Sequence, residues 1–383
     1  MKQASNRSAI APFLAMEMAR EADRIISAGR NIVRFDVGQP YFGAPARALD
    51  AVRDSFNANA LGYTEGLGLY ALRARLSRFY AEKHGVDVLP ERIVITTGAS
   101  GAFLLAFLAL FDAGDRVALA APGYPPYRQI LSALGIKPAI VSAEAHEQYQ
   151  LAPHHLDELS ERSPLAGALI ASPANPTGAM LSKTGLAALA AACRNHGAAL
   201  VSDEIYHGLT YDGRASSALE VDDGAIVINS FSKYWAMTGW RVGWTVAPQH
   251  LITPLERLAQ NLTVAPPTPA QIAALAALEC EEECEARRTI YARNRDILLK
   301  ALPKIGLSPI APPDGAFYML LDISQHGGDS RAFCARALEE AGVALTTGLD
   351  FDDARGAGWV RLAFARETGE IEEGVARLTR WLG

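Results

Sequence analysis

Residues 165–206 read LAGALIASPANPTGAMLSKTGLAALAAACRNHGAALVSDEIY. The runs Ala168–Ala171 and Ala199–Ser202 are short, apolar and followed by polar residues, which is typical of buried strands. Between them, Thr184–Asn195 has the length and the alanine-rich composition of a helix. A strand, a helix and a second strand in this order predict a crossover unit with two parallel strands.

The same alternation continues on both sides of this stretch. A helix is expected at Ser100–Leu110, and further strands are expected at Arg92–Thr96, Arg116–Ala120, Ala225–Asn229 and Val242–Val246. This pattern predicts an α/β fold with a mainly parallel, doubly wound sheet flanked by helices. Ligands bind such sheets at the carboxyl ends of the strands, where several polar residues of this chain fall.

The pattern changes after about residue 265. Three prolines precede a long charged helix expected at residues 269–302, and the elements after it are strands at Ala316–Asp322 and Trp359–Ala365 with a helix at Ser330–Ala341. We read these as a smaller α+β domain formed by both termini, with a helix around Ala15–Ala28 packed against it. The expected domains are residues 1–43 (N-terminal arm and part of the small domain), 44–268 (large ligand-binding domain) and 269–383 (interdomain helix and C-terminal small domain).

Composition excludes several functional classes. The chain has 383 residues, a net charge of −6 and no basic stripe, so we expect no nucleic-acid partner. The apolar stretch Ala102–Phe111 is too short to cross a bilayer, so no membrane partner is expected. Cys280 and Cys284 lie among glutamates that disfavour thiolates, so we expect no metal there. Few cysteines without a C-x-x-C pair indicate a reducing, cytoplasmic location.

The segment NSFSKYWAMTGWR at residues 229–241 places one lysine between hydroxyl side chains. An apolar pocket or a second cation lowers the pKa of a lysine enough to allow a Schiff base with an aldehyde. Ser230, Ser232 and Arg241 can hold a phosphate, which leaves Lys233 free for the carbonyl carbon. The aldehyde that also carries a phosphate is pyridoxal 5'-phosphate. A solvated loop lysine is the alternative interpretation of this segment.

Two turns follow predicted strands. Gly98, Ala99 and Ser100 open a helix whose N–H groups can bind an anion, although taken alone the segment favours Ser100 as a simple helix N-cap. Asn175 lies between two prolines, where a fixed side-chain amide can bind a ligand oxygen and an ordinary rigid loop is the alternative.

Carboxylate and aromatic residues complete the set of candidates. Asp203 follows an apolar strand, where a pyridinium N–H is a suitable partner and an N-cap role is the alternative. Tyr206 can then reach the phenolic oxygen of the cofactor. Tyr124 can stack on a planar ring or belong to the core. Arg361 is a lone charge on an apolar strand, which indicates an anion such as a substrate carboxylate.

With these residues in view, the chain resembles the class I and II aminotransferases of the fold-type I pyridoxal-phosphate enzymes. The resemblance covers nearly the whole chain and rests on the order and spacing of these segments: Asp36-Val37-Gly38-Gln39-Pro40, Tyr63-(x4)-Gly68-(x3)-Leu72-Arg73, Gly98-Ala99-Ser100, Asn175-Pro176-Thr177-Gly178, Asp203-Glu204-Ile205-Tyr206, Ser230-Phe231-Ser232-Lys233 and Arg361.

The resemblance implies a role for each matching position. Lys233 forms the Schiff base and moves the proton, Asp203 keeps the pyridine nitrogen protonated, and Asn175 and Tyr206 bind the phenolic oxygen. The remaining roles are ring stacking by Tyr124, phosphate binding by Gly98, Ala99, Ser100, Ser230, Ser232, Arg241 and Tyr63, and substrate carboxylate binding by Gly38, Asn175 and Arg361. Because Tyr63 is expected to act from a second subunit, the resemblance also implies a homodimer.

The expected activity is amino transfer between an L-amino acid and a 2-oxo acid through a ping-pong mechanism. The same residues also serve β-elimination, so a C–S β-lyase is the alternative. A regulator that senses pyridoxal phosphate without turnover is disfavoured, since the matching segments begin near residue 36 and no basic recognition helix precedes them.

Overall fold

A seven-stranded sheet forms the centre of the larger part of the molecule. The structure is a computed structural model that describes residues 3–58 and 61–383. The strand order is β2-β8-β7-β6-β5-β3-β4, and every neighbouring pair is parallel except the two that involve β8. The strands are β2 (Ile93–Thr96), β3 (Arg116–Ala121), β4 (Lys137–Ser142), β5 (Gly167–Ala171), β6 (Ala199–Asp203), β7 (Ile226–Ser230) and β8 (Gly243–Val246).

Helices cover the faces of this sheet, so its central strands are buried on both sides. This explains why β5, β6 and β7 read as continuous apolar runs rather than alternating ones. The helices of this part are α2 (Ala46–Asn57), α3 (Tyr70–His84), α4 (Gly98–Leu110), α5 (Pro125–Leu134), α6 (Pro153–Arg162), α7 (Lys183–Asn195), α8 (Gln249–Leu262) and α9 (Thr268–Ala277). The predicted α/β class with a mainly parallel sheet is confirmed, and of the seven strands of this sheet only β4 was not predicted.

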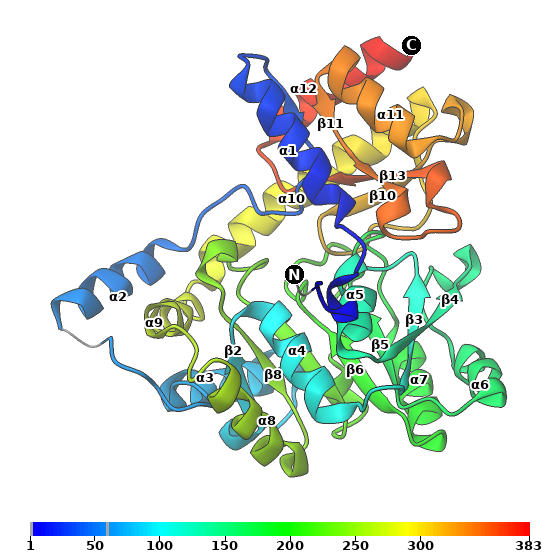
Figure 1. The fold of residues 1–383 in the computed structure, drawn as a ribbon. Coiled ribbons are helices and arrows are strands. Elements are labelled where there is room, and N and C mark those ends of the chain that lie inside the picture. Colours follow the sequence, from blue (N-terminus) through cyan, green and yellow to red (C-terminus); the bar gives the residue numbers. More distant parts are fainter. Residues whose placement is uncertain (1–2, 59–60) are drawn as a thin grey trace.

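A second, smaller group of strands lies above the large sheet in Figure 1. Its antiparallel sheet has the order β12-β13-β10-β9, and β1 pairs with β11 in a separate parallel pair. The elements are α1 (Leu14–Ser27), β1 (Val33–Arg34), β9 (Ser308–Pro309), β10 (Tyr318–Asp322), α11 (Ser330–Arg336), β11 (Val343–Ala344), β12 (Thr346–Thr347), β13 (Trp359–Ala363) and α12 (Thr368–Leu382).

The amino-terminal helix packs against this smaller group, as the sequence predicts. Ala22 and Ile25 of α1 form a buried cluster with Leu338 and Ala344. Both ends of the chain therefore contribute to the same α+β part, which α10 (Glu281–Ala301) joins to the rest (Figure 1).

The expectation of one long helix at residues 269–302 is wrong. The segment forms two helices, because α9 ends at Ala277 and α10 begins only at Glu281. Three glutamates occupy the first turn of α10, where a carboxylate is stabilised by the free N–H groups and the dipole of a new helix. No described helix has the length and apolar character needed to cross a membrane.

Candidate active site

A cleft of about 280 Å³ opens between the carboxyl edge of the large sheet and the small sheet. Several of the segments that meet here follow strands of the large sheet, whose parallel strands end at the same edge. The predicted site residues that line the cleft are Gly38, Ala99, Ser100, Tyr124, Asn175, Asp203, Tyr206, Ser232, Lys233, Arg241 and Arg361. Gly98 and Ser230 lie directly behind this lining. Tyr63 does not line the cleft and is exposed on the surface of the single chain.

Lys233 follows β7 and has an environment that favours a neutral amine. Its Nζ donates to the carbonyl oxygen of Gly38 at 2.6 Å. Burial, together with the nearby charges of Arg361 and Arg241, lowers the pKa of Lys233 to about 8. The neutral amine that a nucleophilic lysine requires is therefore far more populated near neutral pH than in an ordinary lysine.

Asp203 ends β6 and is 4% exposed. Its Oδ2 accepts a hydrogen bond from the hydroxyl of Tyr127, and its Oδ1 accepts one from the N–H of Ile205 at 3.1 Å. Burial nevertheless raises the pKa of Asp203 to about 6. Among the described residues no cation forms an ion pair with this carboxylate, so a pyridinium N–H fits it well.

The turn before α4 and the segment after β7 form a compact cradle. Gly98 has φ +73°, and a Cβ at this position would lie 2.5 Å from Nη2 of Arg241. Only glycine therefore allows the guanidinium of Arg241 to approach the N-terminus of the helix. An anion bound there is stabilised by the guanidinium and by the N–H groups of the helix. Ser100 is not the N-cap, because that position belongs to Thr97, so the capping alternative is wrong.

The two serines before Lys233 differ in their positions. Ser232 lines the cleft, whereas Ser230 is fully buried and its hydroxyl donates to the carbonyl of Val242 at 3.0 Å. Ser230 also accepts from the backbone N–H of Ser232 at 3.1 Å. Ser230 thus orients Ser232 from behind the lining of the cleft, and its contact with a phosphate stays a prediction.

Arg361 projects from β13 and is 3% exposed. Its guanidinium donates to the carbonyl of Asp36 at 2.6 Å and to Oδ1 of Asn175 at 3.2 Å. Its Nε has no hydrogen-bond partner, and no described carboxylate forms an ion pair with it. A buried arginine with a free N–H is suited to bind a carboxylate ligand.

Tyr124 and Tyr206 contribute aromatic rings to the cleft. Tyr124 precedes α5 and contacts Phe13 and Tyr127 edge-on, with ring centroids 6.1 and 5.2 Å away. Its hydroxyl is in a buried setting that raises the tyrosine pKa, so it stays protonated. The hydroxyl of Tyr206 lies 2.9 Å from that of Tyr318.

Sequence reasoning missed two residues of this site, Tyr127 and Tyr318. Tyr127 is three positions after Tyr124, and that spacing places both side chains on one face of a first helical turn. Tyr318 lies in a predicted apolar strand, where nothing distinguishes it from a core residue. Both line the cleft.

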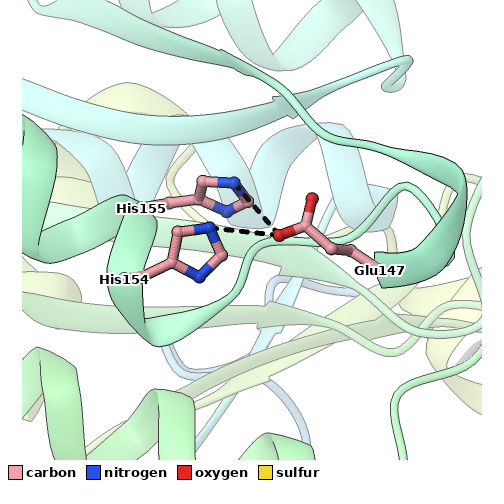
Figure 2. A group of neighbouring side chains, drawn as sticks. All are labelled: Glu147, His154 and His155. Atoms are coloured by element: carbon pink, nitrogen blue, oxygen red, sulfur yellow. Dashed lines mark ion pairs between the residues drawn. The ribbon is translucent and has the colours of Figure 1, made fainter.

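A separate group of side chains has the composition of a metal site. Figure 2 shows Oε1 of Glu147 beside His154 and His155, with Nε2 atoms 3.2 and 3.3 Å away. However, Nδ1 of His155 accepts from the N–H of Ala152 at 3.0 Å, so the neutral ring carries its hydrogen on Nε2. That nitrogen of His155 has no lone pair for a metal ion, and we interpret the group as a charge contact of two imidazoles with a carboxylate rather than as a metal site.

Comparison with known proteins identifies the family. Residues 30–378 match the sequence model of Aminotransferase class I and II. The chain belongs to this family. It is 44% identical over 380 residues to a valine–pyruvate aminotransferase of Mycobacterium tuberculosis, which covers 98% of this chain and 97% of the relative. It is also 34% identical over 358 residues to an arginine–pyruvate transaminase of Pseudomonas aeruginosa, covering 92% and 90%.

Solved structures agree with this assignment. A putative aminotransferase from Silicibacter pomeroyi is 49% identical, with a TM-score of 0.94 over 100% of this chain and 99% of that one. Aspartate aminotransferase of Thermus thermophilus with maleate is 32% identical, with a TM-score of 0.91 over 99% and 100%. The chain therefore has the fold-type I architecture and is a pyridoxal-phosphate-dependent aminotransferase that acts on an amino acid and a 2-oxo acid. Nothing in these comparisons supports the lyase alternative.

Proposed function

We propose that this aminotransferase moves the amino group of a neutral L-amino acid to pyruvate or a similarly small 2-oxo acid. The observation that carries the proposal is the charge of the cleft. Among the described residues its lining cations are Lys233, Arg241 and Arg361, and each already has a task. None is left to bind a second carboxylate on a substrate side chain.

The acidic residues of the cleft are equally committed. Asp36 accepts two hydrogen bonds from Arg34, at 2.8 and 2.9 Å, and Asp203 is reserved for the pyridine nitrogen. The remaining lining is largely apolar and includes Phe13, Met16, Val37, Phe103 and Ile205. Such a wall favours an aliphatic side chain and rejects a charged one. The two pyruvate-named relatives support pyruvate as the acceptor.

The proposed roles of the chain's own residues follow from their positions. Pyridoxal phosphate, when bound, supplies the aldehyde that captures an amino group and a ring that withdraws electrons from the substrate Cα. Arg241, Ser232 and the N-terminus of α4 hold its phosphate, and Asp203 binds its ring nitrogen. Tyr124 packs against its ring, and Asn175 and Tyr206 bind its phenolic oxygen.

Two residues act directly on the substrate in this proposal. Arg361, with the Gly38 backbone nearby, binds the α-carboxylate and thereby fixes the orientation of the Cα–H bond. Lys233, with its lowered pKa, then takes the proton from Cα of the amino donor. In the second half-reaction it returns a proton to Cα of the new amino acid. Burial of Lys233 itself favours the neutral form of its amine.

We further infer a homodimer in which Tyr63 completes the partner's site. Tyr63 is 88% exposed in the single chain and does not line its own cleft. An apolar groove lined by Ile10, Pro12 and Leu104, among others, also lies on the surface near Phe13. A large exposed aromatic and an apolar groove are features of a subunit interface.

A hybrid dimer tests this arrangement. One subunit carries Lys233→Ala and the other Tyr63→Ala. If Tyr63 acts across the interface, one of the two sites regains both native residues and activity returns. If Tyr63 acts within its own chain, both sites remain defective, and the hybrid is as inactive as its parents.

The domain limits and the cellular location are also proposed. The proposed domain limits at residues 43 and 268 are supported by the strands, because β2 to β8 lie between them and β1 and β9 to β13 lie outside. Helix α9, which begins at Thr268, packs against α2 of the large part, and α10 links the two parts. The cytoplasmic location is supported by four free, buried cysteines, of which Cys284 has its pKa raised to about 12 by burial.

The substrate proposal is tested with purified enzyme, pyridoxal phosphate and a panel of L-amino acids. We expect valine, leucine and other neutral amino acids to convert the bound cofactor to its amine form and to release a 2-oxo acid. Pyruvate then restores the original absorbance. Aspartate or glutamate as the preferred donor would refute the proposed selectivity, and release of ammonia without restoration by pyruvate would indicate a lyase. Lys233→Ala is expected to lose the reaction.

A further inference from the structure

Tyr318 of β10 occupies the middle of the site although no catalytic role leads one to expect it there. It is 1% exposed and lines the cleft. Its hydroxyl lies 2.9 Å from the hydroxyl of Tyr206 and 3.5 Å from the carbonyl oxygen of Gly38. The same Gly38 carbonyl accepts from Nζ of Lys233 at 2.6 Å. Tyr318 therefore contacts both Tyr206 and the carbonyl group that accepts a hydrogen bond from Lys233.

The ring of Tyr318 also supports Arg361. The guanidinium carbon lies 4.6 Å from the centroid of Tyr318 and 4.9 Å from that of Phe351 on another segment. Two buried aromatic rings thus flank the charged group, an arrangement that is strongest where water is excluded. This packing holds the guanidinium in place without using its N–H groups, so its free Nε remains available to a ligand.

The hydroxyl of Tyr318 has two possible acceptors, the hydroxyl of Tyr206 at 2.9 Å and the carbonyl oxygen of Gly38 at 3.5 Å, and the shorter contact is the stronger one. Each tyrosine hydroxyl has one hydrogen to donate. If Tyr206 gives its hydrogen to a ligand oxygen, the 2.9 Å contact survives only with Tyr318 as the donor. That donation polarises the hydroxyl of Tyr206 and makes it a stronger donor to the ligand. Gly38 is required beside it, because a Cβ at this position would overlap the Tyr318 hydroxyl.

We infer that Tyr318 is a further positioning residue of the transfer reaction, which orients Tyr206 through its hydroxyl and Arg361 through its ring. The inference rests on the roles proposed above for Tyr206 and Arg361. It predicts that the two contributions can be separated by mutation, since Tyr318→Phe removes only the hydroxyl and Tyr318→Leu removes the ring as well.

The first measurement is a pH titration of the visible absorbance of the enzyme with its cofactor bound to Lys233. Donation to the phenolic oxygen stabilises the form without a proton on the linking nitrogen. Loss of the Tyr318 hydroxyl is therefore expected to raise the titration midpoint by about 0.5 to 1 pH unit. The matched control is Tyr80→Phe, which removes another buried hydroxyl, one that accepts from Nε1 of Trp244 at 3.0 Å outside the cleft. It is expected to leave the midpoint unchanged.

The second measurement is calorimetric binding of isovalerate, a neutral aliphatic carboxylate, to the same proteins. Tyr318→Phe retains the ring and is expected to bind within about 2-fold of the native enzyme. Tyr318→Leu leaves Arg361 unsupported on one face and is expected to bind about 5- to 30-fold more weakly. Equal loss in both variants would contradict the separation of hydroxyl and ring.

The outcomes distinguish this inference from the roles on which it rests. If Tyr206→Phe raises the midpoint and Tyr318→Phe does not, the inference about Tyr318 is wrong. If Tyr206→Phe itself has no effect, the role proposed for Tyr206 fails first. Should Tyr318→Phe not fold, Gly38→Ala displaces the same hydroxyl from the backbone side and is expected to raise the midpoint, and an unchanged midpoint there overturns the inference.

Discussion

Replacement of Asp203 by asparagine is expected to stabilise the cofactor-free protein while weakening its hold on the cofactor. In the folded chain the pKa of Asp203 is raised to about 6, from an ordinary value of 3.8, chiefly by burial. The folded state therefore binds this proton more tightly than the unfolded state. As the pH rises through this window, the native protein must ionise a buried carboxylate and loses stability.

The magnitude follows from the two pKa values. Because the unfolded state ionises more readily, the titration of Asp203 lowers the free energy of unfolding of the cofactor-free protein by about 3 kcal/mol at pH 7.5 and about 1.5 kcal/mol at pH 5. Asparagine has nearly the same shape and no charge at either pH, so Asp203→Asn recovers these amounts. Any hydrogen bond that the amide fails to make with Tyr127 lowers both values equally. The gain of about 1.5 kcal/mol between the two pH values is therefore the diagnostic quantity.

Urea unfolding of the cofactor-free native protein and of Asp203→Asn at pH 5 and pH 7.5 measures this difference. We expect the variant to be favoured more at pH 7.5 than at pH 5. The same stability difference at both pH values would refute the account of a strained, buried carboxylate. With cofactor present the order is expected to reverse, because only the carboxylate can pair with a protonated ring nitrogen.

Substitutions at two other residues test the electrostatics in and near the site. Arg361→Gln removes a charge that lowers the pKa of Lys233, so the pH midpoint for aldehyde labelling of Lys233 in the cofactor-free enzyme is expected to rise above about 8; an unchanged midpoint would mean that burial alone sets it. Glu204→Gln is expected to preserve stability at pH 7 within about 1 kcal/mol in urea unfolding, whereas Glu204→Ala loses about 3 kcal/mol. The reason is that burial raises the pKa of Glu204 to about 8, and its Oε2 lies 3.4 Å from Nδ1 of His207. A neutral side chain that can donate to His207, whether protonated glutamate or glutamine, therefore fits this position. Equal losses in the two variants would contradict this.

Local sequence patterns determined most of the strands and the order of the site residues. Continuous apolar runs such as Ala199–Ser202 indicate strands that helices cover on both faces. A polar residue follows each of these runs, and it therefore lies at the carboxyl edge of the sheet. Lys233, Asp203 and Asn175 could therefore be selected before the fold was known. The prediction of a single long helix after Pro269 was wrong, because a local sequence pattern does not show where one helix ends and the next begins.

The tertiary structure decided which residues support these groups. Tyr127 reaches Asp203 across 76 residues, and Tyr318 reaches Tyr206 across 112, so no local pattern carries either contact. The same holds for Arg361, whose two flanking rings come from different segments. The sequence determined which chemistry is present, because reactive groups follow strands at fixed positions. The pKa values that make this chemistry possible depend on burial and on distant charges, and these exist only once the sheet and the smaller group of strands have closed around the cleft.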